Sequence, residues 1–190
     1  GAGESSHPAS GRISVDGNAY VMHQVVQWLR GHGFDRINAI GHSLGSITAM
    51  QEAGTYQDVD RLVLTGIMHR FSQVAVVALQ TSFYPAVSDP KFSALGLYTG
   101  YLTTIPGVRK SLFFAGLFQS SIVAQDELAK DLVTAIEVSG ATAVVLPLPG
   151  TPTVSQQISA PTLVIVGKQD MLFCDATQVC TADTVKATEA

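Results

Sequence analysis

The sequence is poor in charged residues and cysteine, and it has no cluster of basic side chains. Its 190 residues include 11 Lys and Arg against 15 Asp and Glu, so the formal net charge is −4. Nucleic-acid binding through phosphate neutralisation needs a basic surface, so this composition disfavours that class of partner. Charged residues make up 14% of the chain and hydrophobic residues 46%. This balance excludes intrinsic disorder and indicates a folded domain with a sizeable core.

The sequence also lacks a hydrophobic run that could cross a membrane. Its longest stretch without a charged residue, 138–167, contains four prolines, which would break a helix several times in lipid. We therefore expect no membrane span. The chain opens at Gly1 with neither a basic segment nor an apolar one after it, so no targeting segment is recognisable.

Cysteine occurs at two positions, Cys174 and Cys180. Their six-residue separation allows a small disulfide loop in an oxidising compartment, with two free thiols as the alternative, and the sequence leaves both open. The compartment is likewise open, although the spacing and the low charge content favour export over the cytoplasm. Two thiols without a nearby histidine do not make a structural zinc site. We expect neither a metal nor a cofactor.

Apolar periodicity predicts helices alternating with strands. Between Ser14 and Gly33, apolar residues recur at helical spacing, with Asp16 or Asn18 as N-cap and Gly31 or Gly33 as stop signal. The apolar positions of this helix are Val21, Val25, Trp28 and Leu29. Short apolar runs predict strands at 36–40, 61–65 and 161–167, and residues 44–53 predict a helix that stops at Gly54. Such runs suit a parallel sheet covered on both faces, so the expected fold class is α/β, a mostly parallel sheet with flanking helices.

About a hundred residues between the second and third predicted strands do not continue this alternation. They include a predicted helix near 124–138, whose apolar face would contain Leu128, Leu132, Val133 and Ile136. The segment is rich in aromatic residues: Phe71, Phe83, Tyr84, Phe92, Tyr98, Tyr101, Phe113, Phe114 and Phe118. A long insertion is typical of a functional lid. We therefore expect a core formed by residues 1–70 and 156–190 and a helical cap formed by residues 71–155.

A G-x-S-x-G motif, Gly41-His42-Ser43-Leu44-Gly45, lies between a predicted strand and a predicted helix, as a nucleophilic serine requires. At such a sharp turn the serine backbone is strained, and Gly41 and Gly45 would let neighbouring backbone approach closely. The turn would expose the Ser43 hydroxyl near the positive end of the following helix, with the Leu44 N–H aimed at a developing oxyanion. We therefore predict that Ser43 is a nucleophile.

Residues 36–50, which contain this motif, resemble the nucleophile elbow of the α/β-hydrolase superfamily. Residues 1–8 are similar to the loop after the fourth strand in those enzymes, 61–66 to the sixth strand, and 161–170 to the seventh. The resemblance implies an α/β-hydrolase fold, incomplete here, with a cap insertion.

In that superfamily the acid of the catalytic triad follows the seventh strand in a Gly-x-x-Asp setting. Gly167-Lys168-Gln169-Asp170 matches this pattern, so the resemblance implies Asp170 as the acid. Asp175 and Asp183 are weaker candidates because they lie further from the end of the strand.

The resemblance also places the triad histidine after the acid, but no histidine follows His69. We therefore expect a fragment of a longer hydrolase that lacks the first strands and the C-terminal histidine segment, and that is inactive by itself. His42 is expected to pack behind the elbow, and His69 to face the active-site crevice. The other three histidines, His7, His23 and His32, are expected at the surface.

The resemblance implies a serine hydrolase that forms an acyl-enzyme from an ester, thioester or related acyl bond of an apolar small molecule. His69, Met171 and Phe173 are expected in its substrate pocket. One alternative is a C–C bond hydrolase or cofactor-free haloperoxidase of the same superfamily. The other is a non-catalytic binding protein with the hydrolase fold.

Overall fold

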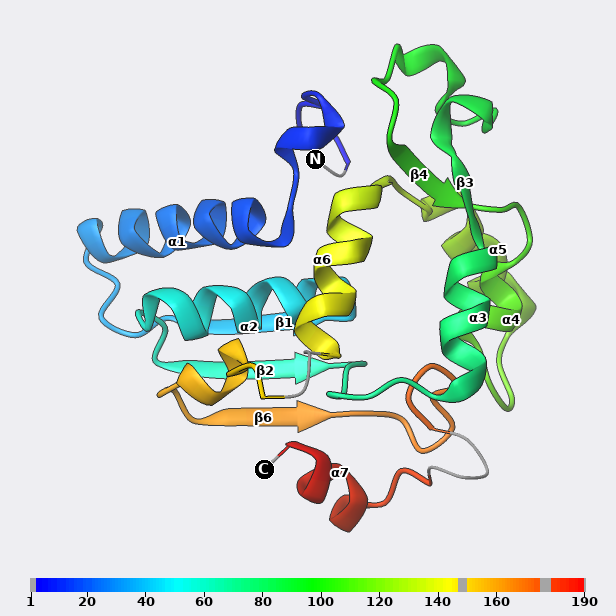
Figure 1. The fold of residues 1–190 in the computed structure, drawn as a ribbon. Coiled ribbons are helices and arrows are strands. Elements are labelled where there is room, and N and C mark those ends of the chain that lie inside the picture. Colours follow the sequence, from blue (N-terminus) through cyan, green and yellow to red (C-terminus); the bar gives the residue numbers. More distant parts are fainter. Residues whose placement is uncertain (1–2, 147–149, 175–178, 190) are drawn as a thin grey trace.

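The computed structural model describes residues 3–146, 150–174 and 179–189. Asp175, one of the weaker acid candidates, lies outside these residues. Figure 1 shows a sheet in the lower half of the molecule, with helices above it and a separate group of short helices and strands to one side. This α/β arrangement confirms the fold class that the sequence predicts.

The main sheet contains three parallel strands in the order β1-β2-β6. They are β1 (Asn38–His42), β2 (Arg61–Thr65) and β6 (Thr162–Ile165), close to the three predicted strands. In register, Gly41 pairs with Leu64, and Leu64 pairs with Val164. Because the strands are parallel, the turns that follow all three meet at one edge of the sheet.

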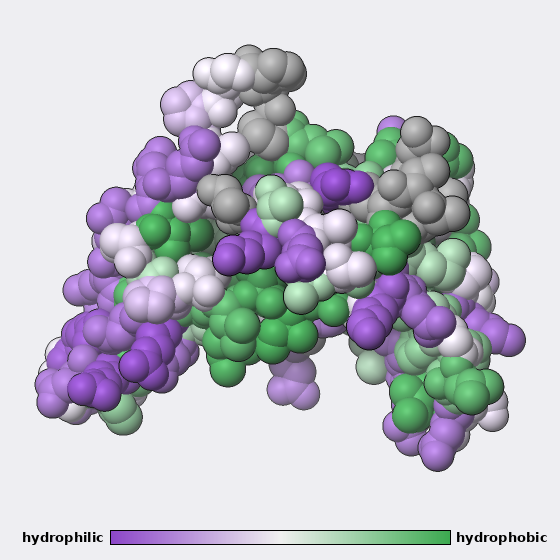
Figure 2. Space-filling model, turned by 90° about the horizontal axis from the view of Figure 1, so that it is seen from below, coloured by the Kyte–Doolittle hydropathy of each residue, from purple (hydrophilic) through white to green (hydrophobic). Residues whose placement is uncertain are grey.

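One face of this sheet is buried under two helices, α1 (Val15–Gly31) and α2 (Leu44–Tyr56). Met50, Leu62 and Leu64 are among the most buried side chains of the core. The opposite face departs from the expectation of a sheet covered on both sides, since Ile40 is 74% exposed and Leu163 and Ile165 are also exposed. Seen from below, the middle of the molecule has a broad hydrophobic area between more hydrophilic flanks (Figure 2).

Helix α1 forms where predicted, but its N-cap and its buried side differ from the prediction. The N-cap is Ser14, whose hydroxyl accepts a hydrogen bond from the Gly17 N–H at 3.0 Å. The buried residues are Val15, Ala19 and Val26, whereas Val21, Val25 and Trp28 are exposed; of the four predicted positions, Leu29 alone packs against the core. Both sides of this helix contain apolar residues, so periodicity alone did not identify the side that contacts α2.

Helix α2 continues past Gly54, where the sequence predicts a stop, and ends at Tyr56. A Cβ at Gly54 would collide with the carbonyl oxygen of Val154. Gly54 is therefore a close-packing position inside the helix, and the chain leaves the helix at Gln57, which has a φ of +54°.

Residues 71–155 contain helices and a second, antiparallel sheet of order β3-β4-β5. In chain order the elements are α3 (Gln73–Thr81), β3 (Phe83–Pro85), β4 (Tyr101–Thr104), α4 (Arg109–Phe113), α5 (Ser120–Ala129), β5 (Val133–Thr134) and α6 (Ala135–Val145). Short 3-10 helices lie at Ser10–Arg12, Ala86–Ser88, Ser93–Leu95 and Val154–Gln157, and α7 (Ala182–Glu189) ends the described chain. None of the described helices has the length and apolar composition needed to cross a membrane.

The single helix predicted near 124–138 is wrong: the chain forms α5 and α6 with β5 between them. The break occurs because Thr134 starts a new helix. Its hydroxyl accepts from the Glu137 N–H at 3.1 Å, and the Glu137 carboxylate accepts from the Thr134 N–H at 2.8 Å. This capping box was visible in the sequence as Thr-x-x-Glu. Helix α6 then packs Ala141 and Val145 into the main core beside Val15.

Candidate active site

Ser43 lies at the sharp turn between β1 and α2, in a backbone conformation that non-glycine residues rarely adopt. Its φ is +51° and its ψ is −120°. The Ser43 N–H donates to the carbonyl oxygen of Thr65 at 2.9 Å, which ties the turn to the end of β2. Strain of this kind persists only where the surrounding structure holds it, and it is concentrated at functional sites.

The two glycines of the motif have different structural roles. A Cβ at Gly41 would lie 2.5 Å from Ser46 Cα and 2.6 Å from the Gly45 carbonyl oxygen, so position 41 requires glycine. A Cβ at Gly45 would meet nothing within 4 Å among the described residues. The expectation that Gly45 allows a close backbone approach is therefore wrong, because its Cα faces open space in the first turn of α2.

Sequence reasoning missed a pair of residues that holds the turn in place, Ser46 and Thr65. The Ser46 hydroxyl donates to the Thr65 carbonyl oxygen at 2.9 Å and accepts from the Thr65 N–H at 3.1 Å. The Thr65 hydroxyl donates in turn to the Gly41 carbonyl oxygen at 3.0 Å. Ser46 is fully buried. The one feature of the sequence that could have indicated this role of Ser46 is a small hydroxyl side chain three positions after the predicted nucleophile.

Asp170 follows β6 in a tight turn at the same edge of the sheet. Its Oδ1 accepts from the Leu172 N–H at 3.1 Å, and its main-chain carbonyl accepts from the Cys174 N–H at 2.7 Å. Burial raises the pKa of Asp170. Hydrogen bonds from backbone N–H groups and the nearby His42 lower this pKa by less, so it lies above its ordinary value. A disulfide joins Cys174 to Cys180, with their Cα atoms 5.5 Å apart, and so closes the chain just beyond this turn.

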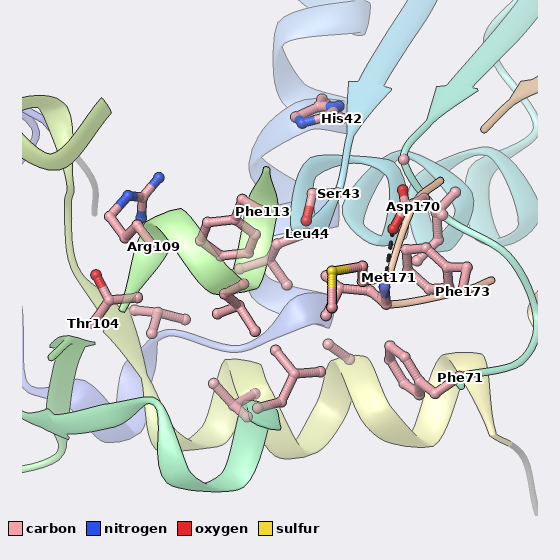
Figure 3. A pocket seen from close by; sticks show the side chains of 18 of the residues that line it. His42, Ser43, Leu44, Phe71, Thr104, Arg109, Phe113, Asp170, Met171 and Phe173 are labelled. Atoms are coloured by element: carbon pink, nitrogen blue, oxygen red, sulfur yellow. Dashed lines mark hydrogen bonds between the residues drawn. The ribbon is translucent and has the colours of Figure 1, made fainter. Parts of the chain in front are cut away.

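Ser43 and Asp170 line one cavity of about 1250 Å³. Figure 3 shows both side chains beside the cavity, with apolar side chains such as Phe71, Phe113 and Met171 around much of the space and Arg109 and Thr104 at the far end. The apolar lining includes Leu44, Phe71, Leu79, Phe83, Leu112, Phe113, Phe114 and Leu146. Met171 and Phe173 are part of the wall as expected, whereas His69 is not among the described lining residues. The two predicted catalytic residues therefore open into the same large, mostly apolar space.

A family model described as the alpha/beta hydrolase fold matches residues 1–186. The chain belongs to this family. The match spans almost the whole chain, which confirms the resemblance inferred from the elbow and supports a hydrolase of this superfamily. No curated protein matches the chain.

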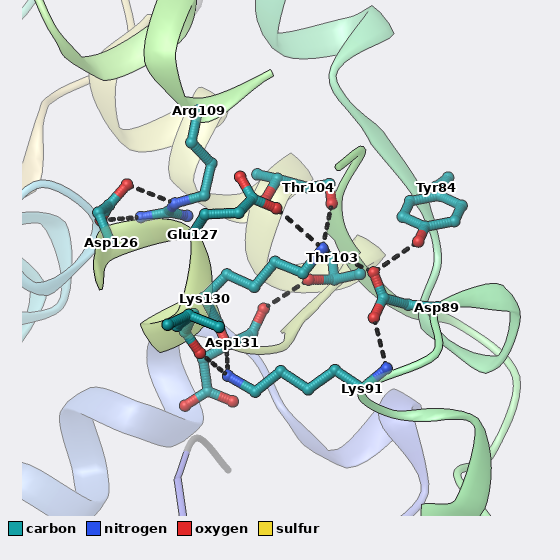
Figure 4. A network of polar contacts seen from close by, with 11 residues as sticks. Tyr84, Asp89, Lys91, Thr103, Thr104, Arg109, Asp126, Glu127, Lys130 and Asp131 are labelled. Atoms are coloured by element: carbon teal, nitrogen blue, oxygen red, sulfur yellow. Dashed lines mark hydrogen bonds and ion pairs between the residues drawn. The ribbon is translucent and has the colours of Figure 1, made fainter. Parts of the chain in front are cut away.

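The far end of the cavity of this alpha/beta hydrolase is lined by charged groups that pair with one another. Arg109 donates to both carboxylate oxygens of Asp126, at 2.7 and 2.6 Å. Lys130, only 6% exposed, lies 2.7 Å from Asp89 Oδ2 and 3.2 Å from Glu127 Oε1 (Figure 4). Both cations at this end are therefore paired with carboxylates from residues 71–155.

Burial and hydrogen bonding act in opposite directions on the central pair of this network. Burial raises the pKa of Asp89, but hydrogen bonds from Lys130, Tyr84 and the Lys91 N–H outweigh it and hold that pKa below its usual range. Burial likewise lowers the pKa of Lys130, while its hydrogen bonds to Asp89 and Glu127 raise it overall. Both groups are therefore ionised at neutral pH.

A base for Ser43 would have to be a side chain close to its hydroxyl, and this alpha/beta hydrolase has five histidines. His42 does not pack behind the elbow: it is exposed, lines the cavity, and its Nδ1 lies 2.9 Å from the Thr65 hydroxyl. Figure 3 shows the Ser43 hydroxyl pointing away from the His42 ring. His23 contacts Asp58, and the His32 Nδ1 lies 2.7 Å from the Trp28 carbonyl oxygen.

The other two histidines lie in different surroundings. His7 packs edge-on against Tyr101, with ring centroids 6.1 Å apart. His69 follows β2 and is half-buried. None of the hydrogen bonds described above joins a histidine to Ser43, so we assign the base to none of the five.

Proposed function

We propose that this alpha/beta hydrolase is a serine hydrolase that cleaves an ester, thioester or related acyl bond through Ser43. The observation that carries the proposal is the strained Ser43 at the cavity wall, with Asp170 lining the same cavity.

The proposed reaction begins when the Ser43 Oγ attacks the acyl carbonyl carbon and loses its proton to a base. The resulting oxyanion would accept a hydrogen bond from the Leu44 N–H, which begins α2 and therefore has no carbonyl partner within the helix. Collapse of this intermediate expels the alcohol or thiol and leaves an acyl group on Ser43. Water then releases the acid and regenerates the serine.

Asp170 is proposed as the acid that orients the base and stabilises its protonated form. The Leu172 N–H fixes the carboxylate in place. An anchored carboxylate of this kind keeps a histidine base in the correct tautomer without itself taking the proton.

The proposed substrate is an apolar small molecule, because the cavity walls are mostly aliphatic and aromatic. We propose that residues 71–155 act as a cap, since α3, α4 and α5 contribute many of the lining side chains. A cavity of about 1250 Å³ is larger than most single-ligand sites, so it suits a long acyl chain or a multi-ring group.

Covalent labelling with a fluorophosphonate tests the proposal. The protein expressed from its complete reading frame is treated with the probe, digested and mapped by mass spectrometry, alongside Ser43→Ala and the control Ser139→Ala. Ser139 is exposed on α6, and its hydroxyl donates to the nearby Ile136 carbonyl oxygen at 3.1 Å. An adduct on the Ser43 peptide that Ser43→Ala removes and Ser139→Ala keeps supports the proposal. Apolar ligand binding without any adduct would instead indicate the non-catalytic alternative.

A further inference from the structure

A second polar cluster lies away from the cavity, at the end of α2 opposite Ser43. It contains His23 of α1, Glu52 near the end of α2 and Asp58 in the loop before β2. One ligand atom from each of the three lies within 4.8 Å of the other two. The closest approach is 2.7 Å, between His23 Nδ1 and Asp58 Oδ2.

Glu52 is the unusual member of this cluster. Its side chain is fully buried, and no N–H or O–H donor among the described residues reaches either of its carboxylate oxygens. Asp58 Oδ1 is buried and has no donor among the described residues either. Two ionised carboxylates that face each other offer only acceptors, so either a bound cation or a shared proton must lie between them for both to be satisfied.

We propose that His23, Glu52 and Asp58 form a binding site for a divalent transition-metal ion, with Zn²⁺ the best match. One imidazole nitrogen and two carboxylate oxygens are ligands that Zn²⁺ accepts, and three protein ligands leave one coordination position for water. Ca²⁺ and Mg²⁺ prefer more oxygen ligands and do not select histidine. An ion can enter from solvent, because the side chains of His23 and Asp58 are 24% and 16% exposed.

Neighbouring side chains already hold these ligands in place, as expected around a metal. The Gln27 amide donates to Asp58 Oδ2 at 2.6 Å, and Tyr56 stacks on the His23 ring with centroids 4.0 Å apart. The site would link α1, α2 and the loop before β2, and so would brace the scaffold behind the elbow. No sequence motif indicates this site, because His23 and Glu52 belong to different helices.

A proton is the rival occupant of this site. Burial, and then the hydrogen bond and charge of Asp58, raise the pKa of Glu52 to about 8, so this carboxyl holds a proton at neutral pH when no metal is bound. A bound ion would displace that proton and would also replace the contact between His23 and Asp58. The test must therefore distinguish metal occupancy from a shared proton.

The experiment is calorimetric titration of EDTA-treated, dialysed protein with Zn²⁺, with Mg²⁺ and Ca²⁺ titrated as controls. Wild type, Glu52→Gln and His23→Gln are compared with His32→Gln, which alters an exposed histidine at the end of the same helix. We expect saturable binding of one Zn²⁺ per chain and a rise in melting temperature. Glu52→Gln and His23→Gln should each weaken binding by more than the roughly tenfold to hundredfold that loss of a residue supporting a metal ligand costs, and His32→Gln should leave it unchanged.

Two results would overturn the inference. One is the absence of saturable Zn²⁺ binding to the wild type, which leaves the shared proton as the occupant. The other is equal Zn²⁺ affinity in wild type and His23→Gln. His23 is partly exposed, so this second variant decides the question even if Glu52→Gln does not fold.

Discussion

The Ser46 hydroxyl and the main chain of Thr65 form two reciprocal hydrogen bonds. The hydroxyl donates to the Thr65 carbonyl oxygen at 2.9 Å and accepts from the Thr65 N–H at 3.1 Å. The same Thr65 carbonyl oxygen accepts the Ser43 N–H at 2.9 Å. One residue at the end of β2 therefore fixes both the strained serine and the first turn of α2. The geometry proposed for catalysis thus depends on a buried side chain that does not touch the cavity.

We expect Ser46→Ala to lower the free energy of unfolding by about 1 to 3 kcal/mol, because the Thr65 N–H loses the Ser46 acceptor and the Thr65 carbonyl oxygen loses one of its two donors. It should also slow fluorophosphonate labelling of Ser43, since the turn keeps fewer of its hydrogen bonds to the end of β2. Chemical denaturation and labelling kinetics measure the two effects. Ser139→Ala is the matched control, and equal behaviour of the two variants would contradict this role for Ser46.

The two glycines of the elbow should respond differently to the same substitution. Gly41→Ala places a methyl group against Ser46 Cα and should destabilise the protein by about 1 to 3 kcal/mol. Gly45→Ala meets open space among the described residues and should be neutral, or stabilising by up to about 1 kcal/mol through helix propensity. Thermal unfolding of both variants checks the contrast, and a larger loss at position 45 would refute it.

The Asp89–Lys130 pair should make the cap sensitive to acid. The pKa of Asp89 is held below its ordinary value of 3.8, so the unfolded chain binds this proton first as pH falls. The pair therefore contributes stability above about pH 4 and loses it progressively as pH drops through the lower, folded-state pKa.

Asp89→Asn should destabilise the protein by up to about 3 to 5 kcal/mol near neutral pH, because it removes the closest partner of the buried Lys130 ammonium and leaves Glu127, at 3.2 Å, as its remaining carboxylate. The variant should also lose less stability than wild type between about pH 4 and pH 2. Denaturant unfolding near neutral pH measures the loss of stability, and denaturant unfolding between about pH 4 and pH 2 measures its pH dependence. Asp126→Asn is the control, since its pair with Arg109 is more exposed; an equal loss in both variants would argue against a special role for the buried pair.

Reduction of the Cys174–Cys180 disulfide should impair the proposed active site more than the fold. The bridge closes a short loop, worth about 2 to 3 kcal/mol, directly after the turn that holds Asp170. Labelling of Ser43 should therefore slow severalfold in Cys174→Ser/Cys180→Ser, with a comparatively small drop in melting temperature. Unchanged labelling in this double variant would show that the bridge does not support the acid.

The elements that could be predicted from the sequence are those whose signals are local. The three strands of the main sheet are short apolar runs, and the elbow is a fixed motif between a strand and a helix. The turn after β6 follows from Gly167 and Asp170, which the family resemblance identified. These signals suffice to bring Ser43 and Asp170 to one edge of a parallel sheet.

The features that escaped prediction depend on contacts between distant residues. Ser46 and Thr65 are 19 residues apart, and nothing in either segment indicates the other. The prediction of the buried side of α1 was wrong because Val25 and Val26 are equally apolar. Which of the two is buried depends on how α1 packs against the neighbouring α2. The break between α5 and α6 was missed because apolar spacing was weighed above the capping box at Thr134.

We propose above all that Ser43 carries the acyl group during turnover. The most direct measurement is rapid acid quench of the protein from its complete reading frame during reaction with a p-nitrophenyl alkanoate, followed by peptide mapping. We expect an acyl group on the peptide that contains Ser43, in an amount equal to the burst of nitrophenol. Ser43→Ala should abolish both the acyl group and the burst. Turnover without an acyl group on Ser43, or turnover that survives Ser43→Ala, would contradict it.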